Sequence, residues 1–305
     1  MTREELNQKK QEEIVNEEKR EKRKKFVILG FKCTFLLIVV FVSFYLYTTY
    51  ISTGSFIVKE ERIISKKLPE NFNGLKIIHF SDLHYGTTIF DDEVEKIVKM
   101  INSRNPDLVI FTGDLIDQNY SLSSKEQEKL IKSLQKINAT LGKYAVTGEE
   151  DGENFNTILN QSHFNILNND YDLVYNNTQD PILLVGMASS LKEDIDIDKA
   201  YHYFTEESHN SNIYVIGMLH EPDSVPKVLE TYPTDLFLAG HSHNGNIRIP
   251  YIGAISKDVG AKKYDQAFYQ IENSKLYISS GLGTNGPGFR LFCRPSINFF
   301  RLSQK

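Results

Sequence analysis

Five short apolar runs, each followed within a few residues by acidic or histidine side chains, constrain this chain more than any other feature. The runs are LKIIHF (75–80), DLVIF (107–111), KYAV (143–146), NIYVIGML (212–219) and DLFLA (235–239). Amphipathic segments separate them, which is the pattern of an α/β domain. Ligands of open α/β sheets gather at the carboxyl ends of strands, so the residues that follow the runs are the candidate site.

The side chains that follow the runs are carboxylates and imidazoles. The candidates are Asp82, His84, Asp114, Glu149, Glu150, His220, His241 and His243. One Asp-x-His or His-x-His pair carries little information, but such groups after all five runs form a specific pattern. Mixed oxygen and nitrogen ligands suit Mn, Fe or Zn and do not suit a structural thiolate site. Two such ions about 3.5–4 Å apart need a bridging carboxylate with ligands on either side.

The order of these motifs resembles the calcineurin-like metallophosphoesterase superfamily, and within it a membrane-anchored bacterial branch of phosphodiesterases. The resemblance is carried by LKIIHFSDLH (75–84), LAGHSHNGNIRIP (238–250) and SSGLGTNGPGFRLFCRPSI (279–297), and it spans about residues 56–302. It implies a four-layer α/β/β/α sandwich with a site for two metal ions at one edge. It also implies a hydrolase that acts on phosphoric ester bonds.

The resemblance assigns the ligands by position. It places Asp82, His84 and His243 on the first ion, Asp114 between both ions, and His220 and His241 on the second. Water or hydroxide held between the ions is then expected to attack phosphorus in line. The resemblance also implies that the ions would lower the pKa of that water and neutralise charge on the phosphoryl oxygens.

One segment departs from the family pattern. Where the family has Gly-Asn-His-[Asp/Glu], this chain has Gly148-Glu149-Glu150-Asp151. Glu149 replaces the asparagine of the second ion, and we predict that it is a ligand that holds metal more tightly but polarises phosphate less. Glu150 replaces the histidine that assists the leaving group. We predict a catalytic general acid with a raised pKa, and a turn carboxylate facing solvent is an equally supported alternative.

The segment from Phe26 to Tyr50 predicts a transmembrane helix. It is apolar apart from Lys32, and as a helix it spans roughly 37 Å, enough to cross a bilayer. A cleaved signal peptide fits less well, because the apolar stretch is long and no small-x-small site follows it. The basic run Lys19–Lys25 precedes it, which predicts a cytoplasmic N-terminus and an extracytoplasmic catalytic domain.

The predicted organisation therefore has four parts: a charged cytoplasmic tail (1–25), a transmembrane helix (26–50), a linker with the first strand (51–74) and the metallophosphoesterase domain (75–305). The net charge of −5, with no basic stripe outside the N-terminus, argues against nucleic acid as a partner. Tethering beside headgroups favours a phosphodiester or pyrophosphate substrate that is lipid-linked or part of the envelope. The alternative function is a metal-binding sensor or scaffold of the same fold that lost activity with the family histidine.

The sequence also predicts structural or substrate-binding roles for three further residues. His79 lies inside an apolar run and is expected to be a packed core histidine. Asn244 follows the His-x-His pair and is expected to shape the turn, and it is also a candidate substrate contact. Arg290 is a candidate for an anionic substrate contact, and a structural ion pair is an equally supported alternative.

Overall fold

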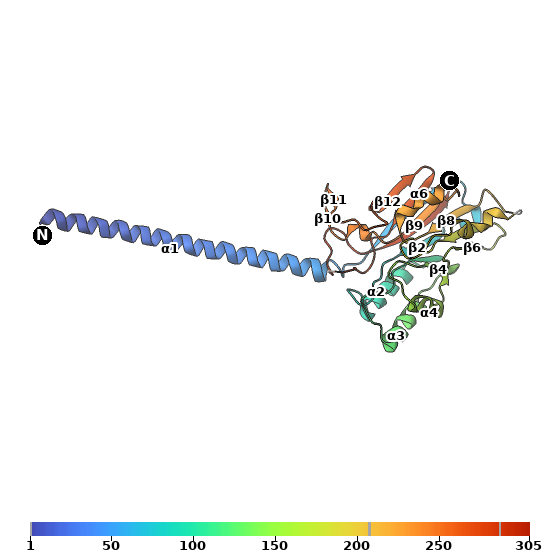
Figure 1. Ribbon diagram of the computed structural model, residues 1–305, viewed down its shortest axis with the longest axis horizontal. Helices are drawn as coiled ribbons and strands as arrows, with labels where there is room; N and C mark the ends of the chain where they lie inside the picture. The colour runs from blue at the N-terminus through green and yellow to red at the C-terminus, as the bar shows by residue number, and fades with distance from the viewer. Residues whose placement is uncertain (1, 207–208, 287) are drawn as a thin grey trace. The chain divides into compact units, whose positions relative to one another are not determined.

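A computed structural model describes residues 2–206, 209–286 and 288–305 (Figure 1). The chain divides into two compact units, Met1–Thr48 and Thr49–Lys305. The first unit is dominated by one helix, and the second contains every strand.

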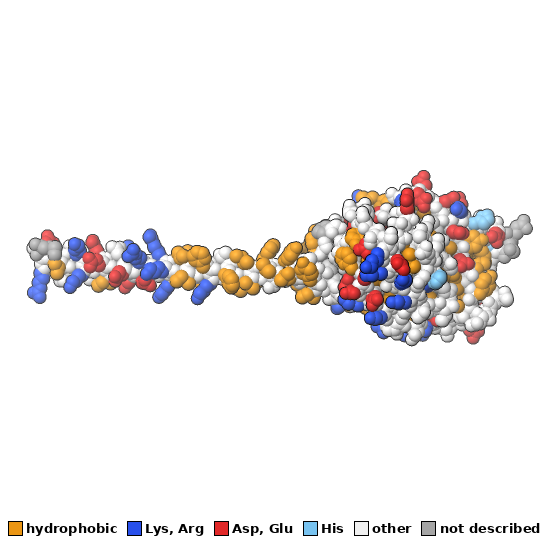
Figure 2. All heavy atoms as spheres, turned by 90° about the horizontal axis from the view of Figure 1, so that it is seen from below, with side chains coloured by type: hydrophobic (Ala, Val, Ile, Leu, Met, Phe, Trp, Pro, Cys, Tyr) orange, Lys and Arg blue, Asp and Glu red, His pale blue; other side chains and the backbone are white. Residues whose placement is uncertain are grey.

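The helix α1 (Arg3–Leu46) combines the predicted charged tail and the predicted membrane span in one continuous element. Its first turn is capped by Thr2, whose backbone N–H and side chain exchange hydrogen bonds with Glu5. Charged side chains occupy its N-terminal half, and hydrophobic side chains surround its C-terminal half (Figure 2). Among the described residues this is the one helix long and apolar enough to cross a membrane, continued to Ile51 by a π-turn (Tyr47–Ile51).

The second unit contains two six-stranded sheets. The first sheet has the order β1 (Ile57–Ser65), β14 (Ser296–Gln304), β2 (Lys76–Phe80), β3 (Leu108–Thr112), β4 (Gly142–Val146), β5 (Asn165–Ile166). The second has the order β12 (Phe268–Ile271), β13 (Ser274–Ile278), β9 (Leu236–Ala239), β8 (Tyr214–Met218), β7 (Ile182–Gly186), β6 (Asp170–Val174). The five apolar runs of the sequence form β2, β3, β4, β8 and β9, as predicted.

Helices cover the outer face of each sheet. The first sheet packs against α2 (Asp91–Asn102), α3 (Ser124–Gln135) and α4 (Asn154–Gln161), which lie together in Figure 1. The second packs against α5 (Ile197–Ala200), α6 (Val225–Leu229) and the 3₁₀ turns at 202–205 and 222–224. Further 3₁₀ turns lie at 70–72 and 243–245.

Alternating side chains divide each strand between two cores. On β2, Ile77 faces the other sheet, whereas Ile78 packs with α2 and its neighbours. On β7, Leu184 lies between the sheets, whereas Leu183 and Val185 pack with the helices of the second sheet. Because successive side chains of a strand point to opposite faces, this arrangement requires layers on both sides of each sheet. The predicted four-layer α/β/β/α sandwich is confirmed.

The strand directions determine where the candidate residues meet. β2, β3 and β4 run parallel to one another, and so do β7, β8 and β9. The carboxyl ends therefore share one edge within each sheet, and side chains that follow strands of both sheets lie together. β14 runs antiparallel to β2 and parallel to β1, which brings the last strand of the chain into the first sheet.

A small hairpin follows the loop after β9. It consists of β10 (Arg248–Ile249) and β11 (Gly253–Ala254), paired antiparallel and separate from both sheets.

Candidate metal centre

The loops after β2, β3 and β9 carry candidate residues in an uncommon backbone conformation. Positive φ values occur at Asp82 (50°), His84 (42°), Asp114 (60°), His241 (65°) and His243 (45°). Left-handed backbone at a residue other than glycine costs energy and concentrates at functional sites. Five of the eight candidate residues are held this way, which indicates a site that the surrounding structure enforces.

Two glycines allow the loops after β3 and β4 to meet. A Cβ at Gly113 would overlap the backbone of Gly148, and a Cβ at Gly148 would overlap the carboxylate of Asp114. Gly113 also has a φ of 86°, which side chains disfavour. The close approach brings the Glu149–Glu150 segment beside Asp114, so these glycines are part of the site.

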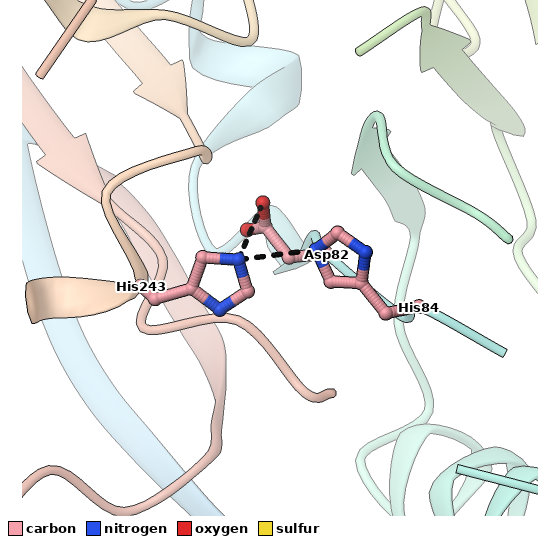
Figure 3. A group of neighbouring side chains, drawn as sticks. All are labelled: Asp82, His84 and His243. Carbon is pink, nitrogen blue, oxygen red and sulfur yellow. Dashed lines mark hydrogen bonds and ion pairs between the residues drawn. The ribbon is translucent and has the colours of Figure 1, made fainter. Parts of the chain in front are cut away.

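Asp82, His84 and His243 converge at one point (Figure 3). The Nε2 atoms of His84 and His243 lie 3.1 Å apart, and His243 Nε2 lies 3.6 Å from Asp82 Oδ1. All three side chains are almost completely buried. Two imidazole nitrogens and a carboxylate facing one another without solvent form a donor set of the kind that holds a divalent ion.

Glu149, His220 and His241 form a second group. Glu149 Oε1 lies 2.8 Å from His241 Nδ1, and Glu149 Oε2 lies 2.7 Å from His220 Nε2. The latter two atoms are buried and, despite this short distance, lack hydrogen-bond geometry to any partner. An unsatisfied buried polar group is costly, and this pair of unsatisfied atoms is directed at a common point, as ligands of an ion are.

Asp114 connects the two groups. Its Oδ2 lies 3.3 Å from His220 Nε2 and 3.7 Å from His84 Nε2, while its Oδ1 accepts a hydrogen bond from Glu150 N at 3.0 Å. A second link is Asp82 Oδ1, which lies 3.7 Å from His220 Nε2. Asp114 Oδ2 therefore lies near one histidine of each group.

Backbone carbonyls orient the histidines of the second group. His220 Nδ1 donates to the carbonyl of Thr112 at 2.5 Å, and His241 Nε2 donates to the carbonyl of Val259 at 2.7 Å. These bonds fix which nitrogen of each ring faces Glu149, and that nitrogen can offer a lone pair to an ion once it has released its proton.

Glu150 is directed at His84. Its Oε2 lies 3.2 Å from His84 Nδ1 and accepts a hydrogen bond from Gln118 N at 3.1 Å. Its side chain is 6% exposed, so the alternative of a turn carboxylate facing solvent is wrong. The contact leaves His84 Nε2 as the nitrogen that faces His243, within the group of Asp82, His84 and His243. Its carboxylate–imidazole geometry is that of a residue that orients a metal ligand.

The electrostatics of the site are those of crowded carboxylates and imidazoles. Burial opposes ionisation of His220, yet Asp114, Glu149 and Asp82 raise its pKa well above the ordinary value. Burial likewise opposes charge on His84, and Glu150, Asp114 and Asp82 raise its pKa to about 9. In the absence of metal, protons on these rings balance the buried carboxylates. Ion binding is therefore expected to release protons.

His243 behaves differently. Burial and the neighbouring charges of His84 and Arg290 lower the pKa of His243 well below its ordinary value, which keeps the ring neutral. Burial also raises the pKa of Asp82. For Glu149, burial is outweighed by His220 and His241, and its pKa is depressed, so this carboxylate is ionised.

Sequence reasoning missed one supporting residue. Asp151 is buried and accepts hydrogen bonds from the backbone N–H groups of Asp114, Leu115 and Gly148 at 2.7–2.9 Å, which joins the loops after β3 and β4. Burial and the charge of Asp114 raise its pKa to about 7. The available signal was the family pattern Gly-Asn-His-[Asp/Glu], in which the fourth position, here Asp151, is acidic.

Arg290 corrects both predictions made for it. The residue is fully buried, which excludes an open substrate contact, and no carboxylate pairs with it in the described part of the chain. Its guanidinium donates to the carbonyls of Ser280 and Gly283 at 2.6 Å and lies 3.3 Å from His243 Nδ1. Arg290 therefore ties the segment before β14 to a candidate ligand.

His79 and Asn244 both form hydrogen bonds with other side chains of the domain. His79 is buried, bonds to Thr112 Oγ1 at 2.9 Å, and has its pKa lowered by burial to about 3, so the core assignment is confirmed. Asn244 Oδ1 accepts a hydrogen bond from Arg248 at 2.9 Å, so it is occupied by the hairpin.

The donor set fits two divalent ions. All seven predicted ligands fall into groups whose ligand atoms lie within 4.8 Å of one another, and Asp82, Asp114 and His220 form such a group across the two. Oxygen and imidazole donors of this kind suit Mn, Fe or Zn. Orphaned buried atoms at Glu149 and His220 give the same result independently.

The family model for calcineurin-like phosphoesterases matches residues 75–245, which is more than half of the chain and contains every candidate ligand.

The chain belongs to the calcineurin-like phosphoesterase family.

Individual members of the family are similar over most of the chain. An uncharacterised metallophosphoesterase of Bacillus subtilis, YkuE, is 28% identical over 263 residues, covering 85% of this chain and 89% of that protein. A Danio rerio transmembrane protein with a metallophosphoesterase domain is 29% identical over 255 residues, covering 78% of this chain and 55% of that protein. The UDP-2,3-diacylglucosamine pyrophosphatase LpxG of Chlamydia muridarum is 26% identical over 295 residues, covering 77% and 86%.

Membership of this phosphoesterase family makes the chain a hydrolase that acts on phosphoric ester bonds and depends on metal ions. The apolar half of α1 and the membrane-protein relatives indicate a single-pass membrane protein. The predicted domain boundaries stay predictions, although β1 is a full member of the first sheet and the compact unit begins at Thr49.

Proposed function

We propose that this chain is a dimetal phosphoesterase in which Asp82, His84 and His243 hold one ion, Glu149, His220 and His241 hold the other, and Asp114 bridges them. The observation that carries the proposal is the buried pair Glu149 Oε2 and His220 Nε2, which lie 2.7 Å apart without a hydrogen bond. A second ion gives both atoms a partner, and it explains how a glutamate replaces the family asparagine.

Two bound divalent ions supply a water nucleophile of lowered pKa and neutralise charge that develops on the phosphoryl oxygens. The protein supplies the orientation. The carbonyls of Thr112 and Val259 hold the rings of His220 and His241 in fixed orientations, and every candidate ligand except the partly exposed Glu149 is buried. The left-handed backbone at five candidate residues supports an arrangement that the surrounding structure enforces.

The contacts of Glu150 support an orienting role for it in this reaction. Its carboxylate holds the Nδ1–H of His84, which would leave Nε2 to ligate an ion held with Asp82 and His243. The general-acid role predicted from the sequence is a separate proposal, since it needs the same carboxylate to protonate the leaving group. A pH–rate profile separates the two roles.

The substrate class that we propose is a phosphodiester or pyrophosphate carried by a lipid or an envelope component. The membrane helix supports it, because an anchored domain meets substrates at the bilayer surface. The relative LpxG, named for a pyrophosphatase of a diacylated sugar nucleotide, supports it too. The basic run Lys19–Lys25 before the apolar half of α1 supports a cytoplasmic N-terminus and an extracytoplasmic domain.

The function is tested with full-length protein in detergent, loaded with Mn and assayed on bis-p-nitrophenyl phosphate. We expect turnover that falls at least about a hundredfold in Asp114→Ala and in His243→Ala. Glu153→Gln is the matched control, because this glutamate is exposed and lies outside the ligand groups. Retained metal with no turnover on several diesters and pyrophosphates would favour the sensor or scaffold instead.

A further inference from the structure

An exposed apolar surface surrounds the β10–β11 hairpin. Its members, which we call the apolar rim, are Ile249 (39% exposed), Tyr251 (108%), Ile252 (76%), Ile255 (62%) and Phe292 (67%). Phe292 joins the hairpin because Arg248 N donates to the carbonyl of the preceding Leu291 at 3.0 Å. Val259 lies nearby. The other exposed large hydrophobic residues in the described part of 57–305 lie singly, on separate segments. A cluster of this kind marks an interaction surface.

The apolar rim is attached directly to the metal-binding loop. Arg248 Nη1 donates to the backbone and side-chain oxygens of Asn244 at 3.0 and 2.9 Å. Ala254 packs so closely on Gly245 that a Cβ there would overlap it. On the other side, Val259 is 61% exposed and its carbonyl holds His241. The hairpin and the segment after it thus flank both histidines of the His-x-His pair.

The charges around the rim have one sign. Among residues 249–263, all of which the structure describes, the exposed side chains are apolar, Ser256, or the three lysines Lys257, Lys262 and Lys263. Asp258 is half-buried, and the buried Asp265 pairs with Lys257 at 3.3 Å, which leaves Lys262 and Lys263 as the lysines, among these three, without an ion pair to a described residue. Exposed apolar side chains beside lysines match the chemistry of a bilayer surface with anionic headgroups.

We propose that the apolar rim docks into the surface of the bilayer in which this chain is anchored. The membrane helix keeps that surface within reach, the rim supplies apolar side chains to the acyl boundary, and Lys262 and Lys263 supply positive charge to anionic headgroups. Tyr251 at the tip suits the interfacial level, where aromatic residues are enriched.

Docking has a consequence for the substrate, which rests on the proposed function. Because the rim is built on the loop of His241 and His243, a docked hairpin holds the two-metal centre at the headgroup level. A phosphodiester or pyrophosphate whose lipid stays in the bilayer then reaches the ions without leaving the membrane. Docking itself is measured without catalysis, so the two proposals can fail separately.

The chain contains no tryptophan, so one introduced tryptophan is the sole reporter. Full-length Ile252→Trp is reconstituted in vesicles of phosphatidylethanolamine and phosphatidylglycerol that contain brominated phospholipid. The matched control is Tyr175→Trp, at an exposed position after β6. We expect bromine to quench Trp fluorescence at least about twofold more in Ile252→Trp than in Tyr175→Trp. The difference is expected to shrink in vesicles without phosphatidylglycerol.

Equal quenching at the two positions would overturn the proposal. Protection of the Ile252→Trp reporter from both bromine and aqueous acrylamide would also overturn it, since the rim would then cover a second copy or another protein. Unchanged thermal unfolding of both variants shows that the hairpin substitution leaves the fold intact. A Tyr251→Ser/Ile252→Ser variant of Ile255→Trp is expected to lose the excess quenching, which ties the signal to the rim.

Discussion

Replacing Glu150 separates the two roles that its position allows. In Glu150→Gln the amide oxygen still accepts a hydrogen bond from His84 Nδ1, but the negative charge is lost. In Glu150→Ala the acceptor is lost as well. The backbone N–H of residue 150, which donates to Asp114 Oδ1, is retained in both variants. The series therefore isolates the side chain.

The magnitude follows from the burial of the contact. Glu150 Oε2 and His84 Nδ1 lie 3.2 Å apart, and their side chains are 6% and 0% exposed, so solvent screens the interaction little. A hydrogen bond to a charged group contributes about 1.5–3 kcal/mol. Removal of a residue that orients a metal ligand costs about 10–100-fold in metal affinity. We expect about tenfold weaker Mn binding in Glu150→Gln and about a hundredfold in Glu150→Ala.

The assay is competition for Mn with a chelator of known affinity, followed by isothermal titration. Glu153→Gln is again the matched control, since it removes a nearby exposed acid without touching the site. Turnover at saturating Mn and its pH profile are measured on the same preparations.

Unchanged Mn affinity in both Glu150 variants would refute the orienting role. If turnover then falls and the alkaline limb of the pH–rate profile disappears, Glu150 is the general acid predicted from the sequence. If affinity falls as expected and full loading restores turnover, the residue acts through His84.

Two other predictions concern Glu149 and His79. Glu149→Asn restores the family residue and removes one negative charge from the site. We expect at least about tenfold weaker binding of one of two Mn ions and faster hydrolysis of bis-p-nitrophenyl phosphate at saturating Mn. Slower hydrolysis at full loading would contradict the idea that the charge of Glu149 weakens the polarisation of phosphate. Burial lowers the pKa of His79 from 6.5 to about 3, so the unfolded chain binds more protons between these values and stability falls as pH drops below 6.5. At pH 5 this amounts to about 2 kcal/mol, at 1.36 kcal/mol per pKa unit. The pH dependence of urea unfolding should be shallower by that amount in His79→Gln, and identical slopes would refute it.

The strands and the ligand positions were predictable because two local signals coincide. A buried strand appears as an apolar run, and the first polar residues after it must lie at the carboxyl edge of the sheet. Asp82, Asp114 and His220 were identified in this way, and the structure brings them together. The family resemblance supplied the order of the layers.

The remaining features depend on contacts between distant segments. The parallel pairing of β1 with β14 joins residues about 240 positions apart, and no local pattern encodes it. The partner of Glu150 depends on how closely Gly148 approaches Asp114. Arg290 was misjudged because its carbonyl acceptors come from the folded segment around it. The apolar rim was not predictable, because a short apolar sequence does not reveal whether its side chains are buried.

The central claim is that carboxylates and imidazoles from five loops hold a pair of divalent ions. Its most direct test is elemental analysis of the full-length protein after Mn loading, combined with electron paramagnetic resonance. The account predicts two Mn per chain with an exchange-coupled spectrum, and loss of the coupling in Asp114→Ala. A protein that binds no transition metal, or two ions whose spectra are uncoupled and insensitive to Asp114, would contradict it.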